Sequence, residues 1–391
     1  MATVPVTPQK ITPVQANMLA RQAILANSQP MLQSIFNQTI VPANQQTVNI
    51  QPSYVGMIRR FLVVITGTIK NNDGANALTL TSHGLSNVLS PNSGVVLTDL
   101  TNYQRINTGG WHLSAVNSAR HRKPYASGFA VETDEMSNYG ENYAIITAPA
   151  TIAASGTANF RAVFDVPVSY SSRDLRGAIM ANVVNATMNL ALTFNPNPFV
   201  ATGSNSLFAM YKGTANAVIQ SATVQVYQDY LDQLPIGPGG IVTPLLDVST
   251  AYELKNVALP NITANVDNPY QFSNYRAFLS TIGIYDDDPA SDTGRVAGTD
   301  INYFALQVAN FTNLWKLDPF TQSQITRDIL NTDYPAGTYL FDSRQKPINT
   351  NQYGNQSLII NPSVATGAIL YLGLEDFFML NLVNSAGSLA A

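Results

Sequence analysis

The sequence contains no cysteine among its 391 residues. Disulfide bonds and thiolate metal sites are therefore excluded, and the composition fits a protein made in a reducing cytosol. Charged residues are also scarce, at 11%, whereas roughly 25% is usual for soluble domains. Asn, Gln, Ser and Thr take their place. The resulting surface is polar but has a weak electric field, which suits close packing against other copies of the same chain.

Positive charge and membrane-spanning segments are lacking too. The net charge is −4, so we predict no sequence-specific binding of nucleic acid. The one basic cluster, Arg120 to Lys123, is interpreted as a solvated loop, with a polar contact to another subunit or to nucleic acid as the alternative. The start, MATVPVTPQK, has no charged region followed by an apolar core, and apolar runs such as Phe61–Ile65 are too short to span a bilayer. We expect a soluble protein without a secretory signal.

The usual catalytic motifs are missing. There is no nucleophile elbow, no P-loop and no dinucleotide-binding glycine motif. The chain has only three histidines, which form no metal-binding pair: His83, His112 and His121. We expect His112, beside Trp111, to be packed or hydrogen bonded. The acidic run Asp286–Asp288, with Asp292, lacks the features of an EF-hand and is interpreted as a solvated loop tip.

These absences predict a protein that is not an enzyme and that has no cofactor, no catalytic residue and no bound metal. One possibility stays open. The paired carboxylates of a glycoside hydrolase are defined by their three-dimensional geometry, which the sequence does not decide.

Residues 1–37 are predicted to form an N-terminal arm with an amphipathic helix. Thr12 suits the N-cap and Pro13 the first helical position. Pro30 should kink or end the helix. The apolar residues that recur at helical spacing are Val14, Met18, Leu25 and Leu32. Such a helix needs a surface to lie on: its own domain, a neighbouring subunit, a membrane or another partner.

From about residue 38 the pattern changes to strands. Apolar and polar side chains alternate in Phe160–Val166, Met188–Phe194 and Thr223–Val226, which places every second side chain on one buried face. Clusters of Gly, Pro and Asn, such as Asn195–Pro198, separate the strands. The fold class is therefore predicted to be all-β, a sandwich or barrel with short inserted helices rather than an α/β fold.

A repeated order of elements indicates two similar domains. In each half a short predicted helix, Ser172–Met180 or Pro319–Leu330, precedes a strand. Asp318 is the expected N-cap of the second helix. Each half then ends in an alternating strand, Thr223–Leu231 or Ile369–Phe378. This repetition is typical of a duplicated domain.

The segment Gln233–Pro244 has the density of Pro and Gly expected of a connection between domains. The predicted division assigns residues 1–37 to the arm, 38–236 to the first domain, and 237–391 to the second domain with a C-terminal tail.

Several motifs are those of a known family. They are YVGMIRRFLV (Tyr54–Val63), GGWHL (Gly109–Leu113), APATIAA (Ala148–Ala154), YQDYLDQLP (Tyr227–Pro235), AGTDINY (Ala297–Tyr303), ANF (Ala309–Phe311), KLDP (Lys316–Pro319) and QYGN (Gln352–Asn355). In these motifs the chain resembles the double jelly-roll major capsid proteins of tectiviruses, which are icosahedral bacteriophages with an internal membrane. The motifs come in the family's order and cover nearly the whole chain.

The resemblance implies two tandem eight-stranded jelly-roll barrels and a homotrimer that acts as a pseudo-hexagonal capsomer. It implies a virion capsid protein, synthesised and assembled in the host cytoplasm, that surrounds an internal membrane and meets minor coat and vertex proteins. It also implies that the N-terminal region lies at the inner face of the shell. The candidate contact residues there are Lys10, Val14, Met18, Arg21, Leu25 and Leu32.

Two other functions stay open at this stage. A phage vertex, spike or receptor-binding protein also uses jelly rolls, although a five-fold vertex needs only one barrel per subunit. A secreted carbohydrate-binding or glycan-cleaving β protein would need a signal peptide, an exposed aromatic platform and paired acids. A stable trimer in sedimentation favours the capsid protein, and a monomer favours the carbohydrate-binding class.

Overall fold

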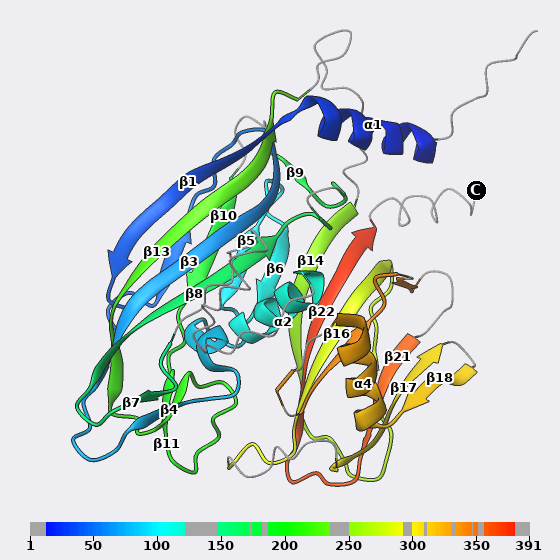
Figure 1. Ribbon diagram of the computed structural model, residues 1–391. Coiled ribbons are helices and arrows are strands. Elements are labelled where there is room, and N and C mark those ends of the chain that lie inside the picture. The colour runs from blue at the N-terminus through cyan, green and yellow to red at the C-terminus, as the bar shows by residue number, and fades with distance from the viewer. Residues whose placement is uncertain are drawn as a thin grey trace, which may run out of the picture.

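The structure is a computed structural model with two halves that follow each other along the chain. The residues that it describes are 13–121, 148–171, 174–181, 187–234, 250–291, 299–308, 311–330, 334–335, 337–345, 347–350 and 356–379. We call residues 13–234 the first half and residues 250–379 the second half. Figure 1 shows the two halves side by side, the first in blue to green and the second in yellow-green to red.

The first half is built on two sheets. One has the order β1-β13-β3-β8, and in the other β2, β10, β5 and β6 are neighbours. The strands of the first sheet are β1 (Gln29–Ile40), β13 (Ala217–Asp232), β3 (Met57–Asn71), β8 (Thr157–Pro167) and the short β9 (Ile179–Met180) beside β3. Those of the second are β2 (Thr47–Ile50), β10 (Asn189–Thr193), β5 (Val95–Thr98) and β6 (Gln104–Thr108). The remaining elements are α1 (Pro13–Asn27), β4 (Leu78–Leu80), η1 (Gly84–Val88), α2 (Gly110–His121), β7 (Thr151–Ile152), β11 (Phe199–Ala201) and β12 (Tyr211–Gly213).

The second half repeats this plan. One sheet has the order β14-β22-β16-β19 and the other the order β15-β21-β17-β18. The elements are β14 (Thr250–Leu259), β15 (Asn268–Gln271), β16 (Arg276–Asp286), β17 (Ile301–Val308), β18 (Phe311–Leu317), α4 (Pro319–Leu330), β19 (Thr338–Asp342), β20 (Ile348–Asn349), β21 (Gln356–Pro362) and β22 (Ile369–Met379).

The strand order of the two halves is the same. The short β9 and β20 and the small sheet β11-β12-β4-β7 are left out of this count, which leaves eight strands in each half. Counted along the chain, one sheet then reads first, eighth, third, sixth, and the other reads second, seventh, fourth, fifth. In both halves a helix of 12 residues follows the fifth strand, α2 in the first and α4 in the second. This is the order of a jelly roll. The prediction of an all-β, duplicated fold is confirmed.

A β-bulge marks equivalent positions in the two halves. In β3 the register with β13 shifts between Asp229, opposite Arg60, and Tyr230, opposite Ile58. In β16 the register with β22 shifts in the same way, and there Ser280 lies opposite Glu375. Because a bulge adds one residue to one strand, it fixes which residues correspond. Asp229 and Glu375 are therefore structural counterparts.

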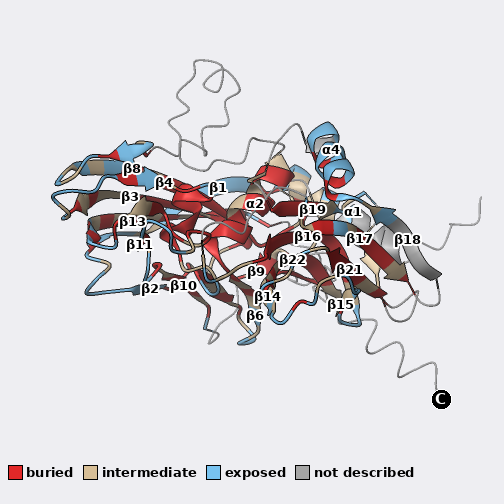
Figure 2. Cartoon of the chain, turned by 90° about the horizontal axis from the view of Figure 1, so that it is seen from below, coloured by how far each residue is buried: buried red, intermediate tan, exposed pale blue. Residues whose placement is uncertain are grey.

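The period-two alternation of the sequence appears directly in the burial of the strands. In β13 the side chains of Val224 and Val226 are buried, whereas Thr223 and Gln225 between them are partly exposed. Figure 2 shows the buried residues along the middle of both halves, with exposed segments at the rims. The apolar alternation predicted from the sequence is thus the inner face of each barrel.

The N-terminal helix is present, but it is shorter than the helical spacing predicted. α1 ends at Asn27, ahead of Pro30, and Leu32 lies on β1 rather than on the helix. β1 pairs with β13 from Gln29 to Ile40, so residues 29–37, assigned to the arm from sequence, are part of a barrel strand. Pro30 is tolerated because β1 is the outer strand of its sheet.

The helix predicted at Ser172–Met180 was wrong. In the described part of this segment the chain turns at Gly177, which has a φ of 85°, and then enters β9, where Ile179 pairs with Ile58. A positive φ is incompatible with a continuing helix. Asp318, by contrast, is the N-cap of α4, since its carboxylate accepts the main-chain N–H groups of Phe320 and Thr321.

Of the predicted connection Gln233–Pro244, only its first two residues are among those described. The proposed domain boundary at residue 236 therefore stays a prediction.

Candidate functional site at the junction of the two halves

The two halves are joined by a strand pair and a helix. β6 pairs with β14 in parallel, with Leu254 opposite Ile106 and Lys255 opposite Asn107. This pair merges one sheet of each half into a single nine-stranded sheet. α2 lies between the halves (Figure 1). The buried core of the first half continues across the junction to Phe377 of β22.

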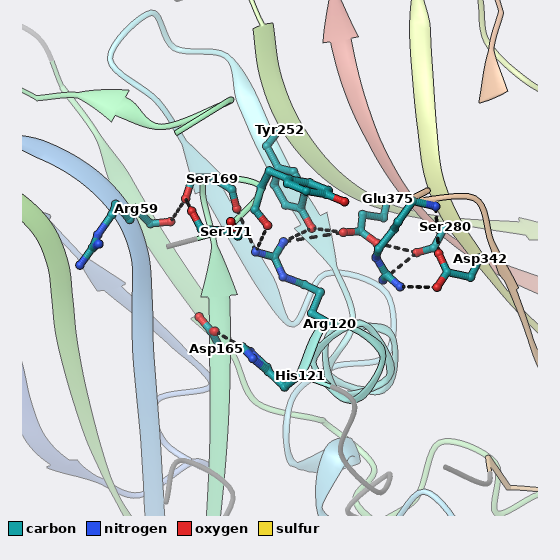
Figure 3. A network of polar contacts seen from close by, with 12 residues as sticks. Arg59, Arg120, His121, Asp165, Ser169, Ser171, Tyr252, Ser280, Asp342 and Glu375 are labelled. Carbon is teal, nitrogen blue, oxygen red and sulfur yellow. Dashed lines mark hydrogen bonds and ion pairs between the residues drawn. The ribbon is translucent and has the colours of Figure 1, made fainter. Parts of the chain in front are cut away.

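A fully buried carboxylate, Glu375, lies at the centre of this junction. Its Oε2 atom accepts hydrogen bonds from Arg344 Nη2 and Ser280 Oγ, both at 2.6 Å. Its Oε1 atom accepts one from the hydroxyl of Tyr252 at 2.8 Å, and Arg120 Nη1 lies 3.7 Å away. Figure 3 shows Arg120 reaching from α2 toward this carboxylate. We call Arg120, Tyr252, Ser280, Arg344 and Glu375 the junction network.

Opposite charges keep Glu375 ionised inside the protein. Burial by itself would raise the pKa of Glu375, but the Arg344 and Arg120 guanidinium groups and the two hydroxyl donors hold it below its ordinary value. A buried charge that is paired and hydrogen bonded in this way requires one fixed geometry of its partners. The junction network therefore determines how α2 of the first half sits on the second half.

Arg120 contradicts the interpretation of the basic cluster as a solvated loop. It lies in the last turn of α2 and donates to Tyr252 at 2.8 Å and to the carbonyl oxygens of Ser169 and Tyr170 at 3.0 and 2.6 Å. His121, beside it, lies 3.1 Å from Asp165. Both contacts are within the chain. The other two members of the cluster, residues 122 and 123, lie outside the described residues.

The first half has its own buried carboxylate at the equivalent position. Asp229 accepts hydrogen bonds from Arg59 Nε at 3.1 Å and from Arg60 Nε at 2.9 Å. Arg60 also donates to Asp165 at 3.2 Å. The counterparts Asp229 and Glu375 are thus both held by arginines. The arginines come from different positions, because Ser280 stands where Arg60 stands in the first half; only the buried carboxylate is common to the two halves.

His112 anchors the start of α2 to the second half. The hydroxyl of Thr108 donates to Asn256 Oδ1 at 2.6 Å, so His112 Nδ1–H donates to the Thr108 oxygen at 2.6 Å. Asn256 Nδ2 in turn donates to the carbonyl oxygen of Pro91 at 2.8 Å. The imidazole packs directly on Gly373 of β22, where any β-carbon would overlap it. The expectation that His112 is packed and hydrogen bonded is confirmed.

The acidic run is not a solvated loop tip. Asp286 and Asp287 are buried, and Asp286 accepts a hydrogen bond from Asn205 of the first half at 2.7 Å. Burial raises the pKa of Asp287, and the nearby carboxylate of Asp300 raises it further. Asp292 lies outside the described residues. Within the described ranges no group of three or more His, Cys, Asp or Glu is arranged to hold a metal ion.

A buried pair of carboxylates also occurs, but it is bridged by a cation. Arg276 Nη1 lies 2.5 Å from Glu253 and 2.7 Å from Asp376, and Lys255 lies 2.5 Å from Glu253. Burial raises the pKa of Asp376 to about 7 despite Arg276, and Glu253 adds to this rise. This arrangement ties β14 to β16 and β22, which is a structural role.

The six candidate contact residues do not share one described surface. Lys10 lies outside the described residues, and Val14 and Met18 lie on α1, where their side chains are not described. The Arg21 guanidinium is 3.9 Å from Asp174. Leu25 packs on the small apolar cluster around Ile24 and Leu231, and Leu32 is exposed on β1. Their contact with a membrane stays a prediction. No helix in the described part of the chain is long and apolar enough to cross a membrane.

Sequence reasoning missed the junction network and α2. One local signal was available: Glu375 and Asp376 interrupt an otherwise apolar strand, ILYLGLEDFF, and charges at such positions require buried partners. The identity of the partners had no local signal, because Arg120 is distant in sequence from Tyr252 and Glu375.

Comparison with known proteins agrees with this architecture. Residues 6–234 match the family described as "P3 major capsid protein N-terminal", and residues 249–390 match "P3 major capsid protein C-terminal". The chain is 39% identical over 398 residues to the major capsid protein P3 of Enterobacteria phage PRD1, covering 98% of each protein. The chain belongs to the P3 major capsid protein family. Like its P3 relative it is a structural protein of the virion capsid and not an enzyme, so the spike and carbohydrate-binding alternatives are discarded.

Solved structures show that the P3 fold extends beyond close sequence relatives. The crystal structure of the STIV major capsid protein superposes with a TM-score of 0.65 at 12% identity, covering 90% of this chain and 97% of that one. The PBCV-1 virus capsid protein has a TM-score of 0.53 at 11% identity, with 90% and 94% covered. At such identities the likeness shows the fold alone. That fold is the double jelly roll of capsid proteins.

Neutralising Glu375 should destabilise this chain strongly. Glu375→Gln removes the buried counter-charge that Arg344 and Arg120 share and leaves Arg344 only its ion pair with Asp342 at 3.3 Å, so we expect the free energy of unfolding in denaturant titrations to fall by about 3–5 kcal/mol. Asp174→Asn is the matched control: its partner Arg176 is partly exposed, and such pairs contribute about 0–1 kcal/mol. Equal effects of the two substitutions would contradict a central role of the junction network.

His112 should make the fold sensitive to acid. Burial lowers the pKa of His112 from 6.5 to about 4, so between these values the unfolded chain binds a proton that the folded chain does not. Stability is therefore complete above about pH 6.5 and is lost as the pH falls toward 4, by roughly 3 kcal/mol in total. Denaturant titrations near pH 7 and near pH 4 should show a smaller loss for His112→Gln than for the unchanged protein. If both proteins lost the same stability between pH 7 and pH 4, the loss would come from carboxylates, which titrate in both proteins, and the assignment to His112 would be wrong.

Proposed function

We propose that three copies of this chain form a capsomer of pseudo-hexagonal outline that tiles an icosahedral shell around an internal membrane. The observation that supports the trimer is the duplication. Each chain carries two jelly rolls of one strand order side by side, so three chains supply six similar barrels. A three-fold assembly can then occupy a six-cornered position of the shell.

The proposal assigns the N-terminal region to the inner face of the shell. Lys10 and Arg21 are its nearby cations, and Leu19 is exposed on α1. Anionic lipid headgroups attract such cations, and apolar side chains of a helix can enter the headgroup region. Contacts with minor coat and vertex proteins belong to the same proposal. Sequence-specific binding of nucleic acid is not part of the proposal, because the net charge is −4.

The purified protein should sediment as a trimer. We expect one species with the mass of three 42.2 kDa chains, unchanged on dilution into the low micromolar range, because permanent interfaces of coat proteins bury large areas. Sedimentation velocity over a series of concentrations measures this. A species that stays monomeric at high concentration would overturn the proposed capsomer.

Two truncations should separate the membrane role of the arm from its structural role. Deleting residues 1–20 keeps Ile24, which is buried against the first half, so we expect folded trimers that form far fewer membrane-containing particles. Deleting residues 1–37 also removes most of β1 and should abolish folding of the first half. Particle yield by electron microscopy and thermal melting report the two effects. Normal membrane-containing particles from the shorter deletion would count against the inner-face assignment.

A further inference from the structure

The contact between the two halves of one chain is asymmetric, because each half contributes different elements to it. The first half contributes its fifth strand, β6, and the helix that follows it, α2. The second half contributes the edge of its first strand, β14, together with the adjoining β22 and β16. One half therefore presents a strand and a helix, and the other half receives them on an edge and a sheet face.

Each chain carries a second set of the same parts. The fifth strand of the second half is β18, and the helix after it is α4. The first strand of the first half is β1, beside β13. In the described part of the chain β18 and β1 are each the terminal strand of their sheets. Figure 1 shows them on opposite outer sides of the molecule, so they cannot meet within one chain.

Equivalent positions of the two helices differ in exposure. The second residue is aromatic in both helices: Trp111 of α2 is 2% exposed, whereas Phe320 of α4 is 63% exposed. The seventh residue is β-branched in both: Val116 is 0% exposed and Ile325 is 36% exposed. Trp111 is covered within its own half, by Phe208 and the carbonyl oxygen of Pro91, while α2 meets the second half through His112 and Arg120. In the described part of the chain, Phe320 and Ile325 at the equivalent positions of α4 are left exposed.

The first strands show the same contrast. Leu254 of β14 pairs with Glu375, and Leu32 of β1 pairs with Asp229, the counterpart of Glu375. Leu254 is 0% exposed at the junction, but Leu32 is 59% exposed. The neighbouring Met31 is exposed as well. A strand edge with exposed apolar side chains is prone to pair with another strand.

We propose that β18 and α4 of one chain dock on β1 and β13 of the next chain, so that the contact between subunits repeats the contact between the two halves. This inference rests on the proposed trimer. Such a contact is head-to-tail, and it closes when the third chain meets the first. Phe320 and Ile325 lie in the contact, and β18 extends the sheet of β1 in parallel.

The repeat predicts the register of the new strand pair. Within the chain, Asn107, three residues before α2 begins, lies opposite Lys255. The residue three before α4 begins is Lys316. The counterpart of Lys255 is Gln33, which follows Leu32 as Lys255 follows Leu254. Lys316 of one chain should therefore lie opposite Gln33 of the next.

Cysteine cross-linking tests this register without background, because the chain has no cysteine. The double variant Lys316→Cys/Gln33→Cys should form covalent rings of three chains on mild oxidation, since Cα atoms of paired strands lie within the range of roughly 4.4–6.8 Å that a disulfide needs. Each single variant should stay uncrosslinked. A matched control pairs Gln33→Cys with Val266→Cys, an exposed residue outside the proposed contact. Trimers that cross-link no better with Lys316→Cys than with the control would overturn the register.

A second variant tests the helix surface. Phe320→Asp/Ile325→Asp should weaken trimerisation by at least about tenfold while the melting temperature of the monomer is retained, because both carboxylates would lose water in the contact. Val364→Asp is the control, because Val364 is an apolar residue outside the surface whose exposure, 44%, lies between those of Ile325 and Phe320. If the unchanged protein is trimeric but neither the cross-link nor the double aspartate has an effect, this docking is wrong and the capsomer stands. If the unchanged protein is monomeric, the capsomer itself is wrong.

Discussion

The parallel pairing of β6 with β14 is the interaction on which the rest of the molecule depends. Each jelly roll leaves strands with open edges, and an open edge exposes unpaired main-chain groups. The chain covers one such pair of edges with its own second half. α2 then has to cross the face of β22, and only a glycine at position 373 leaves room for the imidazole of His112. The close packing of His112 on Gly373 follows from this one strand pair.

Several of the few charged residues of the protein are used inside it. Glu375, Asp229 and Asp376 are all buried, and each is held by at least one arginine. Replacing buried ion pairs by apolar residues is often neutral or stabilising in other proteins, so such pairs are weak evidence for stability alone. At the junction Glu375 lies between Arg120 of the first half and Arg344 of the second, whereas Asp229 and Asp376 each hold strands together within one half. Orientation of the barrels is what a coat protein must hold constant.

The burial of these charged residues also accounts for the low charge of the surface. With charged residues at 11% and arginines committed to internal contacts, the exterior is dominated by amides, hydroxyls and scattered apolar side chains. Like-charged copies therefore repel each other little when they are packed closely. Among the exposed apolar residues of the described chain, Phe320 and Ile325 lie on α4 and Met31 and Leu32 on β1, while others such as Val266 and Val364 lie elsewhere.

The sequence by itself determined what depends on neighbours along the chain. Alternation at period two identified the strands around Phe164 and Val224, and Asp318 with Pro319 identified the start of α4, because pleat and cap are local geometry. Tertiary structure alone decided what depends on distant partners. Arg120 looked like a solvated cation and Asp286 like a loop carboxylate until the second half and Asn205 were placed against them. Leu32 fitted a helical spacing as well as a strand, and pairing with Asp229 from the far end of the same half decided the outcome. Burial of a charge and pairing of an edge strand are long-range events, so no local pattern encodes them.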